Sequence, residues 1–106
     1  MVNKLYGLIG LCQRARKLRS GEFATEKSLK EGKSFLVLIP EDASDNTKKK
    51  FINMAVYRNV PYYIIGTKEA LGHAVGQAER SSMSIEDQGL AEAMIKNIDG
   101  GSANVR

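Results

Sequence analysis

Two short, uninterrupted apolar runs, at residues 35–39 and 61–65, separate segments that have the periodicity of amphipathic helices. This alternation limits the fold more than any other feature, because continuous apolar runs of four to eight residues are typical of strands buried on both faces of a sheet. Helices that alternate with such strands pack on both faces of that sheet. We therefore predict the α/β class, as a three-layer α/β/α sandwich around a small mixed sheet.

Capping residues divide the chain into its expected elements. Ser44, Thr67 and Asp87 are N-cap residues that begin helices, and Gly32 suits a helix end. The expected helices cover residues 3–16, 22–31 and 44–59, a short segment from residue 67, and residues 87–98, with a weak third strand over residues 80–85. The predicted core consists of Leu5, Ile9, Phe35, Val37, Ile39, Ile64, Leu90 and Ile98.

A chain of 106 residues allows one domain, which we expect over residues 1–99, with residues 100–106 as a disordered tail. The longest apolar runs are far shorter than a membrane helix needs, and the first residues lack the apolar core of a signal peptide. The single cysteine, Cys12, excludes an intrachain disulfide and a multi-cysteine zinc site. We therefore expect a cytoplasmic monomer that uses no membrane, metal or cofactor.

Basic side chains are concentrated in the first third of the chain. The whole sequence has 16 Lys and Arg residues against 12 Asp and Glu residues, a net charge of +4. Residues 1–33 contain eight basic and three acidic side chains, a net charge of +5, whereas residues 34–106 have a net charge of −1. A localised basic surface favours a polyanionic partner. The alternative is a solvated, solubilising surface.

The sequence lacks the combinations of residues that usually form a catalytic site. His73 is the single histidine and has no acid or nucleophile beside it, and Cys12 lies on an apolar helix face. The carboxylate pairs at residues 41–42 and 86–87 are adjacent at strand ends, where they more often act as caps or solvated charges than as a catalytic dyad. No glycine spacing matches a dinucleotide or P-loop motif. We therefore predict a non-catalytic protein.

The residues around Gly21 suit a phosphate group. Gly21 begins a helix directly after the basic run at residues 14–19. A helix N-terminus offers free backbone N–H groups to phosphate, and glycine lets a backbone approach closely. Lys27 and Lys30 extend the positive surface, while Phe23 is the one aromatic residue nearby. Recognition of a groove or of the shape of folded RNA is therefore favoured over stacking along a single strand.

Four ordered sequence blocks resemble the ribosomal protein L7Ae/L30e superfamily, and most closely its bacterial YlxQ-type members. The blocks are Gly21-x5-Lys27, GKSFLVLIPEDA at residues 32–43, NVPYY at residues 59–63 and KEALG-x3-G at residues 68–76. The segments GLCQRARKLRSGE at residues 10–22 and DASDNT at residues 42–47 are the most similar to the YlxQ type. The match covers residues 3–98 in one register.

The resemblance implies the same sandwich, and it implies that residues 1–99 form a single RNA-binding domain. Its RNA would be structured, typically a kink-turn, in a ribosomal, translational or other ribonucleoprotein context. The resemblance places the contact at residues 20–27, 41–42 and 75–82. The candidate RNA-binding residues are Arg16, Lys17, Arg19, Ser20, Gly21, Glu22, Phe23, Lys27, Lys30, Glu41, Val75, Gln77 and Arg80.

Two departures from the family pattern fall in that surface. Kink-turn binders usually carry Asn-Glu two and three residues after the glycine, whereas this chain has Phe23 and Ala24. The apolar loop before the last strand is polar here, at residues 77–80. A second hypothesis follows, in which the chain is a protein-interaction module that keeps the fold without base-specific RNA recognition. The acidic stretch at residues 86–99 would then serve a protein partner.

Overall fold

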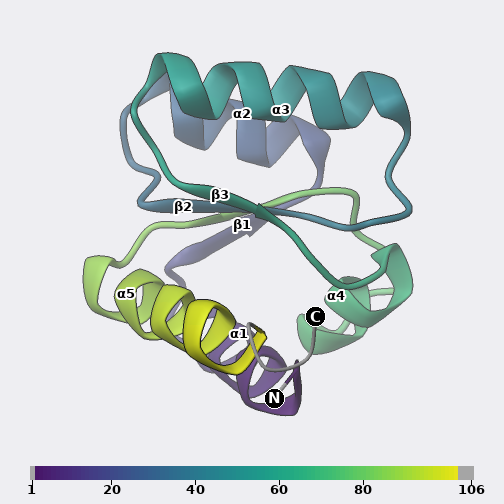
Figure 1. Cartoon of the computed structure of the whole chain (residues 1–106), viewed down its shortest axis with the longest axis vertical. Helices are drawn as coiled ribbons and strands as arrows, with labels where there is room; N and C mark the ends of the chain where they lie inside the picture. The colour runs from purple at the N-terminus through teal and green to yellow at the C-terminus, as the bar shows by residue number, and fades with distance from the viewer. Residues whose placement is uncertain (1, 103–106) are drawn as a thin grey trace.

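The computed structural model describes residues 2–102, which form a four-stranded sheet with helices on both of its faces (Figure 1). Helices α2 and α3 cover one face, and α1, α4 and α5 cover the other. This arrangement confirms the predicted three-layer sandwich. In chain order the elements are α1 (Val2–Arg14), β1 (Leu18–Ser20), α2 (Glu22–Lys30), β2 (Leu36–Ile39), α3 (Asp45–Tyr57), β3 (Tyr62–Ile64), α4 (Lys68–Ala74), β4 (Met83–Ile85), α5 (Gln88–Asn97) and the π-helical turn η1 (Ile98–Ser102).

The sheet is mixed and has the strand order β1-β4-β2-β3. Strands β2 and β3 are parallel, whereas β4 is antiparallel to both β1 and β2. Met83 is opposite Ser20 of β1 and Leu38 of β2, and Ile39 is opposite Ile64. The segments that follow β1, β2 and β3, and the segment that precedes β4, therefore meet at one end of the sheet. Helix α4 lies at this end, on the right of Figure 1.

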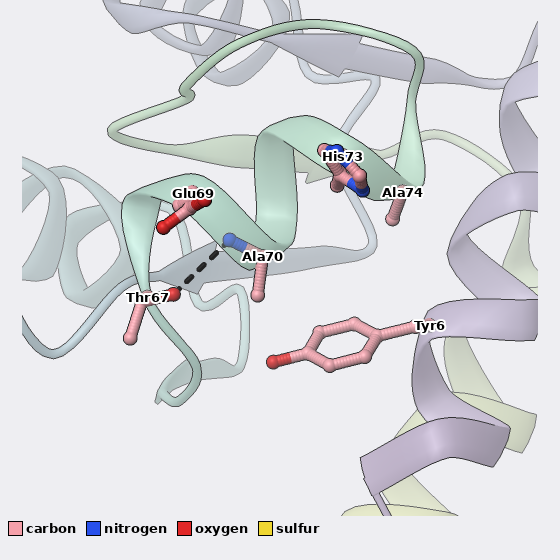
Figure 2. A pocket seen from close by; sticks show the side chains of 6 residues that line it. All are labelled: Tyr6, Thr67, Glu69, Ala70, His73 and Ala74. Atoms are coloured by element: carbon pink, nitrogen blue, oxygen red, sulfur yellow. Dashed lines mark hydrogen bonds between the residues drawn. The ribbon is translucent and has the colours of Figure 1, made fainter.

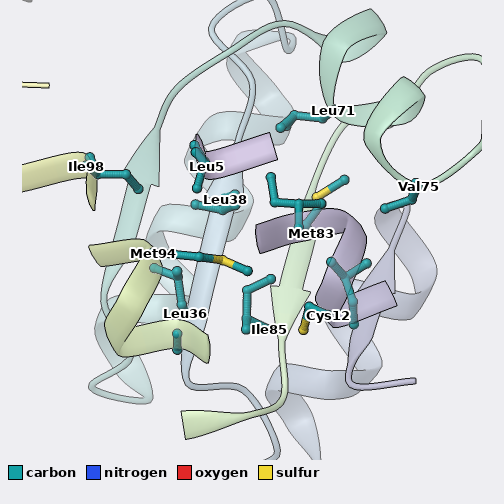
Figure 3. Close-up of a cluster of buried hydrophobic side chains, with 13 residues drawn as sticks. Leu5, Cys12, Leu36, Leu38, Leu71, Val75, Met83, Ile85, Met94 and Ile98 are labelled. Carbon is teal, nitrogen blue, oxygen red and sulfur yellow. The ribbon is translucent and has the colours of Figure 1, made fainter. Parts of the chain in front are cut away.

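Two apolar cores lie on the two faces of the sheet, and β2 contributes to both. Leu36 and Leu38 belong to the larger core under α1, α4 and α5, part of which is drawn in Figure 3. Val37 and Ile39 point to the smaller core under α2 and α3. Successive side chains of a strand point to opposite faces, so a central strand covered on both sides is apolar throughout. The interpretation of this apolar run as a strand buried on both faces is thus confirmed for residues 36–39.

Two of the eight predicted core residues are not in the core. Phe35 is 42% exposed and Ile64 is 41% exposed. Phe35 precedes β2, and Ile64 belongs to β3, which is an edge strand and not the second buried strand that we expected. Leu90 is half-buried against the larger core. The other five predicted core residues are buried: Leu5, Ile9, Val37, Ile39 and Ile98.

Helix ends follow the predicted capping residues. Ser44, Thr67 and Asp87 each accept a hydrogen bond from a backbone N–H of the first turn. At the C-termini, four helices of the described chain end in the same Schellman motif, in which the residue after the cap has a positive φ angle. These residues are Arg16 (φ 62°), Gly32 (φ 71°), Asn59 (φ 58°) and Gly76 (φ 77°). Arg16 is the unusual residue of the four, because glycine and asparagine adopt this left-handed conformation more readily than arginine does.

The predicted tail falls partly on residues that the structure describes. Residues 98–102 form η1 directly after α5, whereas residues 103–106 lie outside the described part, as does Met1. Strand β1 is an element that the sequence did not predict, because it lies within the basic run at residues 14–19. Among the described residues, no helix is long and apolar enough to cross a membrane, and no group of three or more His, Cys, Asp or Glu side chains could hold a metal ion.

Candidate nucleic-acid interface

Helix α2 begins at a glycine that leaves its N-terminus open. Gly21 has φ 95° and, having no side chain, gives the helix no side-chain cap. The N–H of Gly21 donates to the Ser82 carbonyl at 2.9 Å, and the Gly21 carbonyl accepts from the Thr25 N–H at 3.0 Å. The backbone is thereby fixed on both sides, while the first-turn N–H groups lack a capping side chain. Such a terminus attracts anions.

Arg80 joins the loop before β4 to this helix start. Its Nε donates to Ser20 Oγ at 2.9 Å, and its Nη1 donates to the Glu79 carbonyl at 2.8 Å. The position that a Cβ atom on Gly21 would take lies 3.9 Å from the Arg80 side chain. Ser20, Gly21 and Arg80, which are far apart in the sequence, are therefore brought together as the resemblance implied.

A groove of about 310 Å³ runs beside α2 and has basic, aromatic and acidic walls. Arg19 of β1 and Lys27 of α2 line it together with Phe23, whose side chain is 80% exposed. Glu86, which follows β4, also lines the groove, and its Oε1 is 3.5 Å from the Arg19 guanidinium. The remaining lining residues are Ala24, Ser28, Glu31 and Lys33. Three predicted site residues, Arg19, Phe23 and Lys27, thus share one concave surface.

A layer of hydroxyl groups lies under α2 where an apolar contact is more usual. Ser28 Oγ donates to Glu86 Oε2 at 2.6 Å, so it accepts from Ser84 Oγ at 2.7 Å. Ser82 Oγ donates to Thr25 Oγ1 at 3.1 Å. Sequence reasoning missed these residues. The spacing of three between the hydroxyls of α2, together with the alternating serines just before and within β4, is the signal that it could have used.

The basic turn before β1 lies away from the open start of α2. Arg16 and Lys17 are exposed and lie at the start of β1, whereas Gly21 follows the end of this three-residue strand, about 10 Å away. The Lys17 carbonyl is fixed by the Glu86 N–H at 2.7 Å and by the Cys12 thiol at 3.1 Å. Burial of that thiol, and the negative charge of nearby carboxylates, raise its pKa to about 11. Cys12 is therefore an inert, buried thiol at neutral pH.

Lys30 and Glu22 are turned toward α3, which corrects the expected placement of Lys30 beside Lys27. Lys30 Nζ is 2.9 Å from Glu26, and Lys50 of α3 is 2.7 Å from Glu26 and 3.5 Å from Glu22. Hydrogen bonds from Lys50 and Lys30 lower the pKa of the Glu26 carboxyl to about 2. Lys30 thus lines a different groove, between α2 and α3. Lys27 has no carboxylate within 4.0 Å in the described part of the chain.

The two other predicted segments reach the same end of the sheet. Glu41 and Gln77 are exposed in the loops after β2 and before β4. Val75 is a correction, because its side chain is buried in the larger core and is unable to line a surface. The reason is that Val75 caps α4 just before the chain leaves the helix, with its side chain facing the sheet.

A second cavity, of about 420 Å³, lies between α1 and α4 (Figure 2). Tyr6 reaches toward the start of α4, where Thr67 Oγ1 accepts from the Ala70 N–H at 3.0 Å. His73 is exposed and also lines this cavity. No nucleophile, base and orienting acid are brought together here by the described residues, so the cavity has no catalytic arrangement.

Comparison with known proteins gives a consistent result for nearly the whole chain. The model of the ribosomal protein L7Ae/L30e/S12e/Gadd45 family matches residues 3–95. The RNA-binding protein YlxQ of Bacillus subtilis is 38% identical over 94 residues, which are 89% of this chain and 94% of that protein. The large ribosomal subunit protein eL8 of Thermoplasma volcanium is 32% identical over 96 residues, 90% of this chain and 79% of that protein.

Solved structures have the same fold. A protein of unknown function from Bacillus halodurans is 33% identical, with a TM-score of 0.87 over 91% of this chain and 97% of that one. The 15.5 kD RNA-binding protein of Giardia lamblia has a TM-score of 0.78 at 23% identity, over 93% of this chain and 88% of that one. At that level of identity, the second match supports the fold alone.

Proposed function

Because the chain belongs to the ribosomal protein L7Ae/L30e/S12e/Gadd45 family, we propose that it binds structured RNA at the end of the sheet where α2 begins. The observation that carries the proposal is the open N-terminus of α2 at Gly21, with Arg80 and Lys27 on either side of it. Backbone N–H groups and unpaired cations in this arrangement hold phosphate oxygens without reading sequence. We assign the protein no catalytic step.

The RNA that suits this surface is bent or otherwise folded. The elements at this end of the sheet present separate short loops and one helix terminus, which fit a shaped backbone better than a straight single strand. Kink-turns are the RNA class that we propose first, in a ribosomal or other ribonucleoprotein context in the cytoplasm. The relatives named as an RNA-binding protein and as a ribosomal protein support an RNA ligand in a ribosomal context.

Binding at two salt concentrations tests the proposal. The ligands are a kink-turn RNA, the same RNA without its G·A pairs, and a plain duplex. Contact with about 3–5 phosphates gives a log–log salt slope with a magnitude of roughly 2–4. Preference for the kink-turn over its altered counterpart would support the choice of kink-turns, whereas equal binding would leave only general recognition of folded RNA.

Lys27→Ala is the variant that tests the surface itself. We expect weaker binding to all three RNAs by a similar factor, and a salt slope reduced by about 1. Lys96→Ala is the matched control, because Lys96 is an exposed lysine on α5, on the opposite side of the sheet. If Lys27→Ala binds as the wild type does, and changes at residues 86–99 disrupt a protein partner, the protein-interaction hypothesis replaces this one.

A further inference from the structure

Phe23 exposes an aromatic ring at a place where folding does not use it. The side chain is 80% exposed in the first turn of α2, while the buried residues of this helix are Thr25, Ser28 and Leu29. A ring that contributes so little burial keeps a large apolar face free for a ligand. Nucleobases stack on such faces whatever their sequence.

The groove beside this ring has the size and the charge for one nucleotide. Its volume of about 310 Å³ is near the lower end of ligand pockets, roughly 300–1,000 Å³, which suits a single base. Arg19 and Lys33 on its walls already have carboxylate partners, Glu86 at 3.5 Å and Glu31 at 3.3 Å. Lys27 has no such partner among the described residues, so its ammonium group is available to a phosphate.

Glu86 supplies a buried acceptor in the lining of the groove. Its side chain is 8% exposed, and its Oε2 is occupied by the Ser28 hydroxyl at 2.6 Å. Its Oε1 has the Arg19 guanidinium at 3.5 Å, which is longer than a good hydrogen bond. A carboxylate has about four lone-pair sites, so Glu86 retains acceptor capacity. Every unpaired base has an N–H donor for such an acceptor, because adenine, cytosine and guanine have an exocyclic amino group and uracil has its ring N3–H.

We propose that this groove is a subsite for one unpaired nucleobase of the bound RNA, which stacks on Phe23 and donates an N–H group to Glu86. Lys27 holds a phosphate next to that nucleotide. The inference rests on the proposed function and deepens it, because it adds a bulged or extruded nucleotide to the folded RNA.

Hairpin RNAs that differ at one bulged nucleotide test the subsite. The set contains each of the four bases at the bulge, an abasic bulge and a continuous duplex, and affinity is measured by fluorescence anisotropy. We expect each of the four bulged bases to bind roughly 5- to 100-fold more tightly than the abasic bulge, because each base stacks on the ring and has an N–H donor for Glu86.

Three variants and one control separate stacking from a general loss of binding. Phe23→Ala brings every bulged RNA to the level of the abasic one, whereas Phe23→Trp keeps the difference. Tyr57→Ala on α3 is the matched control, since that ring is 81% exposed and lies outside the groove. Glu86→Gln weakens the binding of every bulged base but not of the abasic bulge, and circular dichroism verifies that the altered contact with Ser28 leaves the fold intact.

Different results refute the nucleobase subsite and the proposed RNA-binding function. If the abasic bulge binds as tightly as the others, or if Phe23→Ala leaves all affinities unchanged, the subsite is refuted, while duplex binding that depends on Lys27 leaves the proposed function standing. If no RNA of the set is bound at either salt concentration, the proposed function is refuted as well.

Discussion

Replacing Arg16 by glycine should make this protein more stable. Arg16 follows the cap of α1 in the left-handed conformation, with φ 62°, which disfavours an L-residue by roughly 1–2 kcal/mol. Glycine removes this strain but adds about 0.4–1 kcal/mol of backbone entropy to the unfolded chain. The net gain in the free energy of unfolding is therefore about 0.5–1 kcal/mol. For a domain of this size, that raises Tm by about 2–8 °C.

The mirror substitution is available in the same molecule. Gly32 ends α2 in the same motif with φ 71°, and an added Cβ atom would meet no atom within 4 Å. Gly32→Arg should therefore lower the free energy of unfolding by about 0.5–1 kcal/mol, through conformation alone. Urea denaturation of both variants with an unchanged m-value is the measurement. A destabilised Arg16→Gly variant, or a neutral Gly32→Arg variant, would refute the reasoning.

Three further outcomes follow from named contacts. Gly72→Ala should destabilise the fold by about 1–3 kcal/mol, because the added Cβ would lie 2.7 Å from the backbone of Glu79; thermal unfolding checks this. The pKa of Glu26 is lowered to about 2, so its ion pair with Lys50 stabilises the protein above pH 4.5 and is lost as the pH falls toward 2; Glu26→Gln should flatten stability over that window. Cys12 should resist a thiol reagent at pH 8 until the chain unfolds, since its pKa is about 11; a native-state reaction at the unfolded rate would contradict this.

Layers and caps were predictable from the sequence because each depends on local chemistry. The continuous apolar run at residues 36–39 is what a strand between two cores requires, and Ser44, Thr67 and Asp87 accept N-terminal hydrogen bonds that their side chains suit. The apolar run at residues 61–65 looked similar but forms an edge strand. Periodicity alone does not distinguish an edge from a centre, because strand order is decided by long-range pairing.

The candidate site was predictable only in part, for a related reason. The segment from Ser20 to Lys27 and the position of Arg80 followed from the family pattern. The turning of Lys30 toward α3 did not, because it depends on ion pairs with Glu26 that involve a second helix. The prediction for Val75 was wrong because an apolar residue at a helix end can face either the solvent or the core. The side chain of Val75 faces the larger core.

The hydroxyl layer under α2 explains how a helix with so little apolar surface holds the proposed RNA site in place. Leu29 is the buried apolar residue of α2, and the rest of its underside consists of Thr25 and Ser28. Hydrogen bonds contribute only about 1 kcal/mol each, yet they are directional, so the pairs to Ser82 and Ser84 fix the rotation of α2 about its axis. Rotation is what decides whether Phe23 and Lys27 face the groove. A helix held by apolar contacts alone would tolerate small rotations, whereas this one is coupled directly to β4 and to the loop before it.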